Sequence, residues 1–515
     1  TLAATVSLLS LGTAHSLPEI KVAKRDKHTG GRSSNVARGI LMERSPQAEG
    51  DGHLSTSVFD VATWSFGGAY YANISVGTPP QPQTVILDTG SSDLYFDASS
   101  AQECTLPEDN PNACQGGTFN PDASKTYEIA AQSPAFNTSF GDGTTAQGPF
   151  GRDTVCVADV CISNVQFGLA TEVDSTTGFA IGLMGVGYSF IEAVQDHIYP
   201  NMPEVLVSSG VINSRLYSVY LNDADTVSGS ILFGGIDTTR YTGDLVTLDL
   251  LPDLGLLQNR RIAFVDQFIT VVTEVSANTA QTGGKDTTII SGTQTDYLAY
   301  ASDSGSLPML LDTGSAAWSV TKPVYDALIQ QAFPYVDSSG ICDCSHAVDT
   351  ETVTLTFGDA VQIKVPATEF IVPAYNTTTQ EQYTDSHGNP LCAFLISASD
   401  SSLDDEGFGI VGDSILRSMY VVFDLDNGQA SIAQAKVNST DQPNVKVVEA
   451  GPSGVAKAVS VANNPPQQSA SVWPGVNATV TFSASTMQST IGQATGIDAV
   501  PEEARPDDGK NAASG

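Results

Sequence analysis

LDTGSSDLYF, residues 87–96, and LDTGSAAWSV, residues 311–320, place the same Asp-Thr-Gly triplet twice in one chain. Each triplet follows an apolar run and precedes a serine and a second apolar segment. Two apolar residues and a glycine follow further on, at 183–185 and at 410–412, so the interval from aspartate to glycine is 97 residues in one half and 100 in the other. The sequence therefore predicts two similar β units, each with one aspartate at a strand-end turn.

A pair of aspartates has a chemical use that a single one lacks. Two carboxyl groups held face to face cannot both ionise, so the pair keeps one proton and can supply both a base and an acid to amide hydrolysis. We expect Asp88 and Asp312 to form such a pair, with no metal and no cofactor. The alternative is two turn aspartates without a catalytic role. The residues expected to support the pair, by hydroxyl cross-bracing, close backbone approach and backbone hydrogen bonds, are Thr89, Gly90, Ser91, Thr313, Gly314 and Ser315.

Composition limits the class of protein. The 515 residues are 41% hydrophobic, enough for a sizeable core, and 22 Lys and Arg against 57 Asp and Glu give a net charge of −35. This charge argues against nucleic acid as a partner, because no basic face is available to displace counterions from phosphates. The acidity fits either simple solubility or a protein built for acid, where protonated carboxyl groups repel one another less.

The two ends of the chain differ from its middle. Residues 1–16 resemble a partial secretory signal peptide, and residues 17–65 are basic, as expected of a detachable pro-segment with cleavage points at Lys24-Arg25 and Arg44. A disordered leader is the alternative. Residues 437–515 are rich in Ser, Ala, Thr and Gln, which predicts a disordered tail.

Between these ends, short β-branched and aromatic runs separated by turn residues predict a mostly-β protein. We place an N-terminal lobe at 66–240 and a C-terminal lobe at 241–436, with a long polar insertion at 276–306. The best helix candidates are the stretches 189–198, 202–210 and 322–333.

Seven cysteines are few for a chain of this length, so we expect them to form local disulfides and not a disulfide scaffold. We expect the bridges Cys104–Cys114 and Cys156–Cys161. Cys342, Cys344 and Cys392 allow one long-range bridge and leave one thiol; Cys344–Cys392 is the expected pair and Cys342 the alternative partner. Five sequons fit a secreted or cell-surface glycoprotein, at Asn73, Asn137, Asn376, Asn438 and Asn477.

These residues carry a family resemblance. Residues of about 68–436 resemble the pepsin-like aspartic endopeptidases, especially the secreted and cell-surface fungal ones of the yapsin and candidapepsin kind. The resemblance implies an all-β, bilobal fold with a central cleft, Asp88 and Asp312 as the catalytic pair, polypeptide substrates, and a pro-segment that acts as intramolecular inhibitor. The matching stretches are NISVGTPPQPQTVILDTGSSDLYF, FGDGTTAQGPFGRDTV, GLMGVGY, RLYSVYLNDADTVSGSILFGGIDTTRYTGDL, LLDTGSAAWSV and GFGIVGDSILRSMYVVFDLDNGQASIA.

Three positions depart from the family pattern. Phe140 stands where the family has its flap tyrosine, and Tyr95 stands where it has the tryptophan that forms a hydrogen bond with that tyrosine. We expect Phe140 to keep an apolar wall for substrate, Gly141, Asp142 and Gly143 to complete a hairpin lid, and the Tyr95 hydroxyl to compensate in part from the opposite side. Simple strand packing is the alternative for Phe140. Ser315 replaces the usual threonine, and because a hydroxyl is retained we expect little loss.

The sequence leaves three functions open. The protein is an acid endopeptidase matured from a precursor, a non-catalytic peptide-binding member of the same fold, or a structural cell-wall glycoprotein whose C-terminal stalk is the functional part. The twin aspartates favour the first. The excess of Asp and Glu favours cleavage beside Lys or Arg over cleavage beside bulky apolar residues; it includes Asp142 in the expected lid and Glu108 and Asp109 in the expected disulfide loop. The alternative is that these acids belong to the general acidity of the chain. We expect a monomer, with cell-wall or lipid-anchored membrane association left open.

Overall fold

The computed structural model describes residues 22–23, 52–63, 69–105, 114–131, 133–141, 143–175, 180–194, 197–226, 228–251, 265–292, 306–375, 381–398, 408–462, 470–471 and 479–480. These residues form mainly strands with a few short helices, so the all-β prediction is confirmed. Among them, no helix is both long enough and apolar enough to cross a membrane.

A large sheet runs through the middle of the molecule in the strand order β16-β29-β28-β13-β14-β2-β3-β4-β12-β5-β10-β9-β6, with β1 paired to β2. Its strands are β1 (Val22–Ala23), β2 (Leu54–Thr63), β3 (Ala69–Val76), β4 (Gln81–Asp88), β5 (Leu94–Asp97), β6 (Glu128–Ile129), β9 (Phe150–Val157), β10 (Val160–Ala170), β12 (Leu183–Gly185), β13 (Leu216–Tyr220), β14 (Gly229–Phe233), β16 (Tyr241–Asp249), β28 (Met419–Asp424) and β29 (Gln429–Ala435).

A second sheet belongs to the later half of the chain and has the order β23-β22-β17-β19-β27-β20-β26, with β18 paired to β17. Its strands are β17 (Ile269–Asn278), β18 (Thr287–Ser291), β19 (Leu307–Leu311), β20 (Trp318–Val320), β22 (Thr352–Phe357), β23 (Val361–Pro366), β26 (Ile396–Ala398) and β27 (Gly409–Val411).

Smaller elements complete the fold. Three-stranded sheets join β7 (Phe136–Ser139), β8 (Thr145–Gly148) and β11 (Glu172–Asp174), and β21 (Ile341–Asp343), β24 (Ile371–Pro373) and β25 (Leu391–Phe394). The two-stranded pairs are β15 (Gly235–Asp237) with β30 (Val445–Val447), and β31 (Ala470–Ser471) with β32 (Thr479–Val480). The helices are α1 (Gln102–Thr105), α2 (Met202–Ser208), α4 (Lys322–Gln331), α5 (Ala367–Phe370), α7 (Asp413–Leu416) and α8 (Gly454–Ala458).

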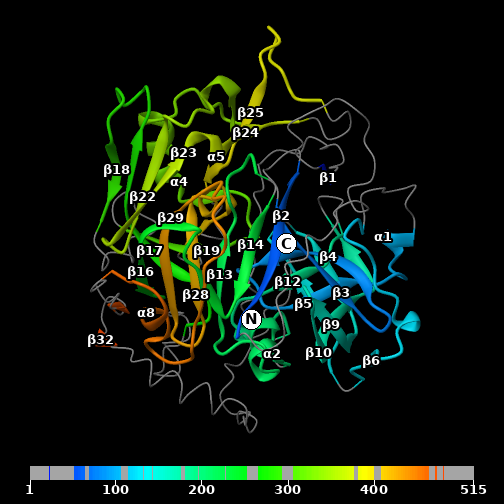
Figure 1. The fold of residues 1–515 in the computed structure, drawn as a ribbon. Helices are drawn as coiled ribbons and strands as arrows, with labels where there is room; N and C mark the ends of the chain where they lie inside the picture. Colours follow the sequence, from blue (N-terminus) through cyan, green and yellow to red (C-terminus); the bar gives the residue numbers. More distant parts are fainter. Residues whose placement is uncertain are drawn as a thin grey trace, which may run out of the picture.

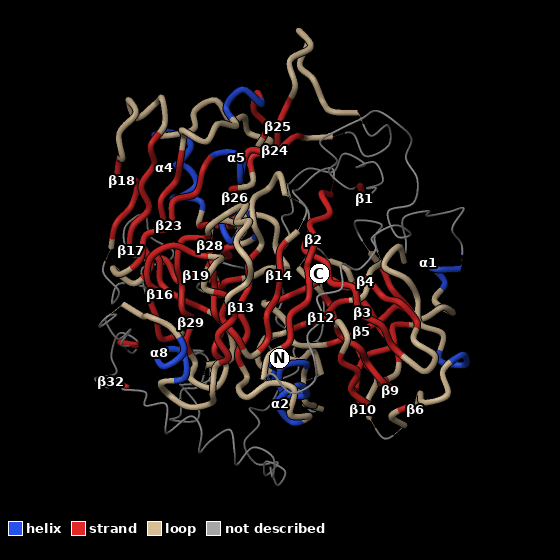
Figure 2. The backbone as a smooth tube through the Cα atoms, in the orientation of Figure 1, coloured by secondary structure: helices blue, strands red, loops and turns tan. Residues whose placement is uncertain are grey.

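The arrangement is bilobal. Figure 1 shows the blue and cyan strands of the first half on one side and the green to yellow strands of the second half on the other. The late strands β28 and β29, in orange, lie beside β13 between them, and Figure 2 shows how completely strands dominate this centre. The β13–β28 ladder pairs Val219 with Val421, so the two halves are joined by main-chain hydrogen bonds.

Burial patterns explain why these segments form strands. In β3 the second half alternates half-buried and buried residues, as expected of a strand with one covered face, whereas all six residues of β28 are buried. One apolar cluster extends from the first lobe into the second and includes Val85, Phe96, Phe233, Trp318 and Phe423. The twin aspartate turns therefore rest on one shared core.

Of the three helix candidates, two form helices. Asn201 caps α2 by accepting a hydrogen bond from the Glu204 amide, with Met202 and Leu206 buried on its inner face. The stretch 322–333 contains α4, whose inner face buries Val324 and Leu328. In the stretch 189–198 the described residues, 189–194 and 197–198, form no α-helix, and residues 189–191 form a single 3₁₀ turn.

Residues 54–63, near the end of the predicted pro-segment, form β2 within the large sheet, where Leu54 and Val58 are buried. Three other predicted segments need correction. The boundary at 240/241 does not separate the sheets, because β16, β28 and β29 join strands of the first half. The 276–306 insertion begins as the β17–β18 hairpin. The tail starts later than 437, since β30 pairs with β15 and Val455 of α8 packs on Val448 and Leu245.

Candidate active site

Each aspartate lies where one strand of a repeated three-strand unit ends. In the first half β12 pairs parallel with β4 and antiparallel with β5, which brings Gly185 opposite Asp88. In the second half β27 pairs parallel with β19 and antiparallel with β20, and the Asp312 amide donates to the carbonyl of Val411 at 3.0 Å. The two halves thus use the same crossing of strands to hold an aspartate.

The glycines that follow each repeat are explained by this crossing. A Cβ on Gly185 would lie 2.5 Å from the backbone nitrogen of Ser92, and a Cβ on Gly412 would lie 2.3 Å from the carbonyl oxygen of Ala317. No other residue fits where two backbones approach so closely. The paired Leu-Met-Gly and Ile-Val-Gly elements therefore belong to the same device as the aspartates.

The threonines lock the two turns to each other. Thr89 Oγ1 donates to the carbonyl of Leu311 and Thr313 Oγ1 donates to the carbonyl of Leu87, each at 2.8 Å. The Thr313 amide donates to Thr89 Oγ1 at 3.0 Å and the Thr89 amide donates to Thr313 Oγ1 at 3.1 Å. Four buried hydrogen bonds thus cross between the halves and fix the spacing of the aspartates.

The carboxyl groups themselves lie close together and away from solvent. Asp88 is 3% exposed and Asp312 is 0% exposed. The amides of Gly90 and Gly314 donate to the nearer aspartate, Asp88 Oδ1 and Asp312 Oδ1, at 2.8 Å each. A Cβ on Gly90 would meet Asp312 Oδ1 at 2.6 Å, and a Cβ on Gly314 would meet Asp88 Oδ1 at 2.6 Å.

The symmetry ends at the serines. Ser91 Oγ donates to Asp88 Oδ2 at 2.5 Å, whereas Ser315 Oγ donates to the carbonyl of Ala317 at 3.4 Å. The expectation that Ser315 supports the pair through its hydroxyl is therefore wrong in this structure. A serine has no γ-methyl group to fix its rotamer, so its hydroxyl is free to turn to a backbone acceptor.

Burial and a neighbouring charge act on the second aspartate. Burial, and then the negative charge of Asp88, raise the pKa of Asp312 well above its usual range. Asp312 Oδ2 is buried and has no hydrogen-bond partner among the residues that the structure describes. Since Asp88 receives the additional hydroxyl donor, the geometry favours a pair in which Asp88 carries the charge and Asp312 the proton.

The hairpin formed by β7 and β8 carries Phe140 next to its turn. The Phe140 amide donates to the carbonyl of Thr144 at 2.8 Å, and Gly143 has a φ of +85°, a conformation that favours glycine. Phe140 packs against the apolar cluster that contains Tyr95 and Leu183, with its ring centroid 6.1 Å from that of Tyr95. Gly141 lies at the turn of this hairpin, and Asp142 is outside the described residues.

Tyr95 does not act as expected. Its hydroxyl donates to the carbonyl of Ile181 at 3.1 Å, so the hydroxyl is used by the body of the lobe while the ring faces Phe140 and Phe136. The contact between hairpin and lobe is therefore aromatic, where the resemblance leads one to expect a phenol hydrogen bond.

The cysteines form three bridges in the structure: Cys104–Cys114, Cys156–Cys161 and Cys344–Cys392. The remaining cysteine, Cys342, is buried and lies directly across the β21–β25 ladder from Cys392. The asparagines of the described sequons differ in their surroundings. Asn137 is exposed on β7, the side-chain oxygen Oδ1 of Asn73 accepts from Thr84 Oγ1, and the side-chain nitrogen Nδ2 of Asn438 donates to Asp223.

Several predicted residues lie outside the described ones: Glu108, Asp109, Asn376, Asn477, Lys24, Arg25 and Arg44. Of the signal peptide, none is described, and of the pro-segment only Val22, Ala23 and residues 52–63 are.

A pair of buried acids, Asp93 and Glu192, follows the first aspartate turn and was not predicted from the sequence. Asp93 accepts hydrogen bonds from the Ala193 amide at 2.7 Å and from the Tyr199 hydroxyl at 2.9 Å. Glu192, 1% exposed, accepts from the Tyr199 amide at 2.9 Å. Burial, and then the charge of Asp93, raise the pKa of Glu192 to about 10. About a hundred residues separate the two acids in sequence, so only the fold brings them together.

Two β lobes joined at a pair of buried aspartates define the class: a pepsin-like aspartic protease. In agreement, the family described as Eukaryotic aspartyl protease matches residues 69–435. The chain is 33% identical over 405 residues to the probable aspartic-type endopeptidase opsB of Aspergillus oryzae, which covers 76% of this chain and 74% of that protein. It is 31% identical over 378 residues to the secreted aspartic protease 3 of Candida albicans, covering 72% of this chain and 80% of that one.

The chain therefore belongs to the eukaryotic aspartyl protease family and is an aspartic-type endopeptidase, whose substrates are polypeptides.

Proposed function

We propose that this protein is a secreted endopeptidase that is made as a zymogen and cuts peptide bonds in acid with a water molecule activated between Asp88 and Asp312. The observation that carries the proposal is the convergence of two buried carboxyl groups with unequal hydrogen bonding. Such a pair holds one proton, so it can act as base and acid in the same step.

The proposed reaction begins with Asp88 ionised and Asp312 protonated. Asp88 takes a proton from the water, whose oxygen attacks the carbonyl carbon, while Asp312 gives its proton to the carbonyl oxygen. In the resulting diol, the leaving nitrogen takes a proton from Asp88, the C–N bond breaks, and a diol hydroxyl returns a proton to Asp312. The pair ends in its starting state, and one water has been added across the peptide bond.

Substrate binding is proposed to use the hairpin of β7 and β8. An extended peptide offers main-chain hydrogen bonds to such an edge, and its side chains alternate between the two faces. Phe140, half-buried at the end of β7, supplies an apolar wall, and the hydroxyl-free ring leaves hairpin closure dependent on aromatic packing with Tyr95.

A zymogen form that opens in acid is supported by charge. Protonation of surface carboxyl groups in acid weakens the attraction between a basic segment and the acidic body of the protein, and the raised pKa of Asp312 keeps the acid partner protonated at the same pH. Residues 17–51 are basic and the whole chain carries −35, so we propose that this segment covers the cleft at neutral pH. Secretion is supported by the apolar N-terminus and by the name of the Candida relative.

For the cleavage preference we propose basic side chains beside the cut, with Asp142, which lies between Gly141 and Gly143 in the sequence, as one acid that recognises them. Replacing Asp142 by Asn should weaken cleavage after Lys or Arg about tenfold and leave cleavage after Phe or Leu within twofold, because only the former loses a charge pair. Equal effects on both substrate types would remove Asp142 from this role.

The test of the proposed function is hydrolysis of a mixed peptide library from pH 3 to pH 7 by the matured protein and by Asp312→Asn, with cut sites read by mass spectrometry. Cleavage that is fastest in acid and lost in Asp312→Asn supports the proposal. A wild-type protein that matures and folds but cuts nothing would favour a peptide-binding role, and unchanged cleavage by Asp312→Asn would contradict the mechanism.

A further inference from the structure

Asp97, the last residue of β5, is a buried acid that the hydrolytic site does not use. It is 0% exposed, and among the described residues neither of its carboxyl oxygens has a hydrogen-bond partner. A buried polar group without a partner costs free energy and calls for a reason beyond packing.

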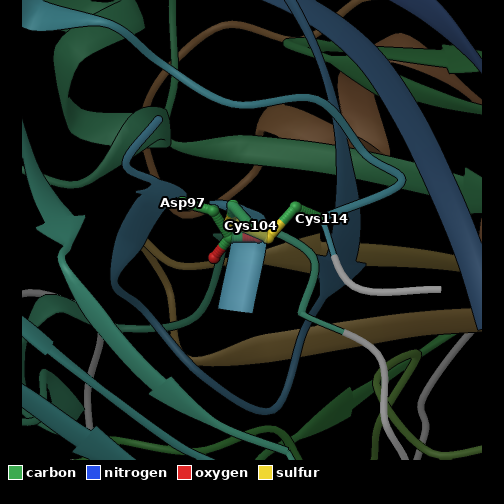
Figure 3. A group of neighbouring side chains, drawn as sticks. All are labelled: Asp97, Cys104 and Cys114. Atoms are coloured by element: carbon green, nitrogen blue, oxygen red, sulfur yellow. A yellow bond between two sulfur atoms is a disulfide. The ribbon is translucent and has the colours of Figure 1, made fainter. Parts of the chain in front are cut away.

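The neighbours of Asp97 supply that reason. A carboxyl oxygen of Asp97 and the two sulfur atoms of the Cys104–Cys114 bridge all lie within 4.8 Å of one another. Figure 3 shows the Asp97 side chain beside this bridge. Both cysteines are half-buried, so the bridge is within reach of a small molecule. Because the sulfur atoms are bonded to each other, they are not thiolate ligands, and the group is not a metal site in this state.

Among the described residues, little around Asp97 would stabilise a negative charge on its carboxyl group. The negative charge of Glu103 in α1 repels a carboxylate there, and the residues that pair with the Asp97 backbone, Ala170 and Phe119, are uncharged. Burial, and then the charge of Glu103, raise the pKa of Asp97 to about 7. Asp97 is therefore a neutral acid beside the bridge in acidic solution and a carboxylate in alkaline solution.

We propose that Asp97, Cys104 and Cys114 form a thiol-exchange site that accepts small thiols, with Asp97 as its proton donor. A thiolate attacks one sulfur of the bridge, a new S–S bond forms, and the Cys104–Cys114 bond breaks with its electron pair on the other sulfur. That sulfur takes the proton of Asp97 and leaves as a thiol. A second thiol then cleaves the mixed disulfide, giving two protein thiols and one small-molecule disulfide, and Asp97 regains a proton from water.

The other two bridges provide an internal comparison. Among the described residues, neither Cys156–Cys161 nor Cys344–Cys392 has a carboxyl or imidazole group within 4.8 Å of both sulfur atoms. They lack the proton donor that Asp97 supplies to the first bridge. The exchange site thus depends on the placement of one acid, and it is independent of the hydrolytic pair.

Cleavage of the Cys104–Cys114 bridge would affect the β7–β8 hairpin that carries Phe140. Cys114 packs against the apolar cluster that holds Tyr95, Phe136 and Phe140. Helix α1, which carries Cys104, lies against β11, the edge strand paired to β8. We therefore expect cleavage of Cys104–Cys114 to loosen β7 and β8.

The experiment is partial reduction of the full chain with limiting dithiothreitol from pH 5 to pH 9, followed by acid quenching, alkylation and mass spectrometry of each bridge. The measured quantity is the reduction rate of Cys104–Cys114 divided by that of Cys156–Cys161 in the same tube, so the ionisation of the reductant cancels. We expect this ratio to be about tenfold higher at pH 5 than at pH 9, with a midpoint near 7.

In Asp97→Asn the ratio should be low and independent of pH, because the amide donates no acidic proton. Glu103→Gln is the matched control next to the bridge: it should keep the pH dependence and move the midpoint to lower pH, and it serves alone if Asp97→Asn does not fold. Hydrogen exchange of β7 and β8 should accelerate when the bridge is opened. A pH-independent ratio in the wild type, the same profile in Asp97→Asn, or an unmoved midpoint in Glu103→Gln would overturn the proposal.

Discussion

The two aspartate turns have the same backbone and different side-chain surroundings. Each turn has a glycine amide on its carboxylate and a threonine that reaches across to the other half. Only the first has a serine hydroxyl on its aspartate, because Ser315 turns to the carbonyl of Ala317. The first turn also buries Asp93 at the position where the second has Ala317. The repeated backbone gives both aspartates the same geometry. The different side chains around them give Asp88 and Asp312 unequal roles.

The largest effect should come from removing either acid. Asp88→Asn and Asp312→Asn each leave one carboxyl group, which cannot be base and acid in the same step, so kcat/KM for peptide hydrolysis should fall by about 10³-fold or more in both. Near-ultraviolet circular dichroism checks that each variant is folded. A folded variant that keeps more than a tenth of the activity would show that the pair is not shared.

The second largest effect should come from adding a methyl group at Gly90 or Gly314, the glycines that face the opposite aspartate. A methyl group on Gly90 or Gly314 would lie 2.6 Å from the opposite carboxylate, so Gly90→Ala and Gly314→Ala should lower kcat by about 10²-fold through displacement of the pair. Gly243→Ala is the control: its φ of +77° strains an alanine, but nothing lies within 4 Å. It should cost stability and leave kcat unchanged, and a similar loss of kcat in Gly243→Ala would attribute the effect to strain.

The buried acids under the first turn should make stability depend on pH. The pKa of Glu192 is raised in the folded state, so the folded protein keeps a proton that the unfolded chain releases, and stability falls as pH rises above the usual glutamate range toward about 10. Glu192→Gln should therefore raise the free energy of unfolding at pH 7 by about 2 kcal/mol and leave it nearly unchanged at pH 3.

Denaturant titrations at the two pH values measure this difference, with Glu172→Gln on the exposed face of β11 as the control. A gain at pH 3 equal to the gain at pH 7 would show that the effect is packing and not ionisation.

The smallest effect should come from removing the hydroxyl of Ser91 or Ser315, and its size should differ between the two serines. Ser91→Ala removes a hydrogen bond to a charged carboxylate, so kcat/KM should fall about tenfold and the acid limb of the pH profile of the pair should move to higher pH. Ser315→Ala removes a hydrogen bond to a backbone carbonyl and should change kcat/KM less than twofold. Equal losses in the two variants would contradict the asymmetry.

Local pattern was sufficient to predict much of the fold and of the candidate site. The repeated triplets, the apolar runs before them and the glycines after them are close in sequence to what they build, so the two β units and the aspartate turns were predictable. The Cys156–Cys161 bridge spans one hairpin, which is also local. The fold class follows from β-branched and aromatic runs with frequent turn residues.

What could not be predicted depends on partners distant in sequence. The pairing of β13 with β28 and of β15 with β30 joins segments about two hundred residues apart, and no local signal selects such partners. Leu54 and Val58 are buried in β2 within the large sheet, and the basic composition of the segment before them does not predict this pairing. The Ser315 rotamer and the meeting of Asp93 with Glu192 are decided by packing after the fold has formed.

The assignment of the single proton is tested most directly by neutron diffraction of the matured, deuterium-exchanged protein at a pH where it hydrolyses peptides. We predict deuterium on a carboxyl oxygen of Asp312, none on Asp88, and a Ser91 hydroxyl deuteron directed at Asp88 Oδ2. Deuterium on Asp88 with a bare Asp312 would contradict the central claim, because the hydroxyl donor would then serve the wrong member of the pair.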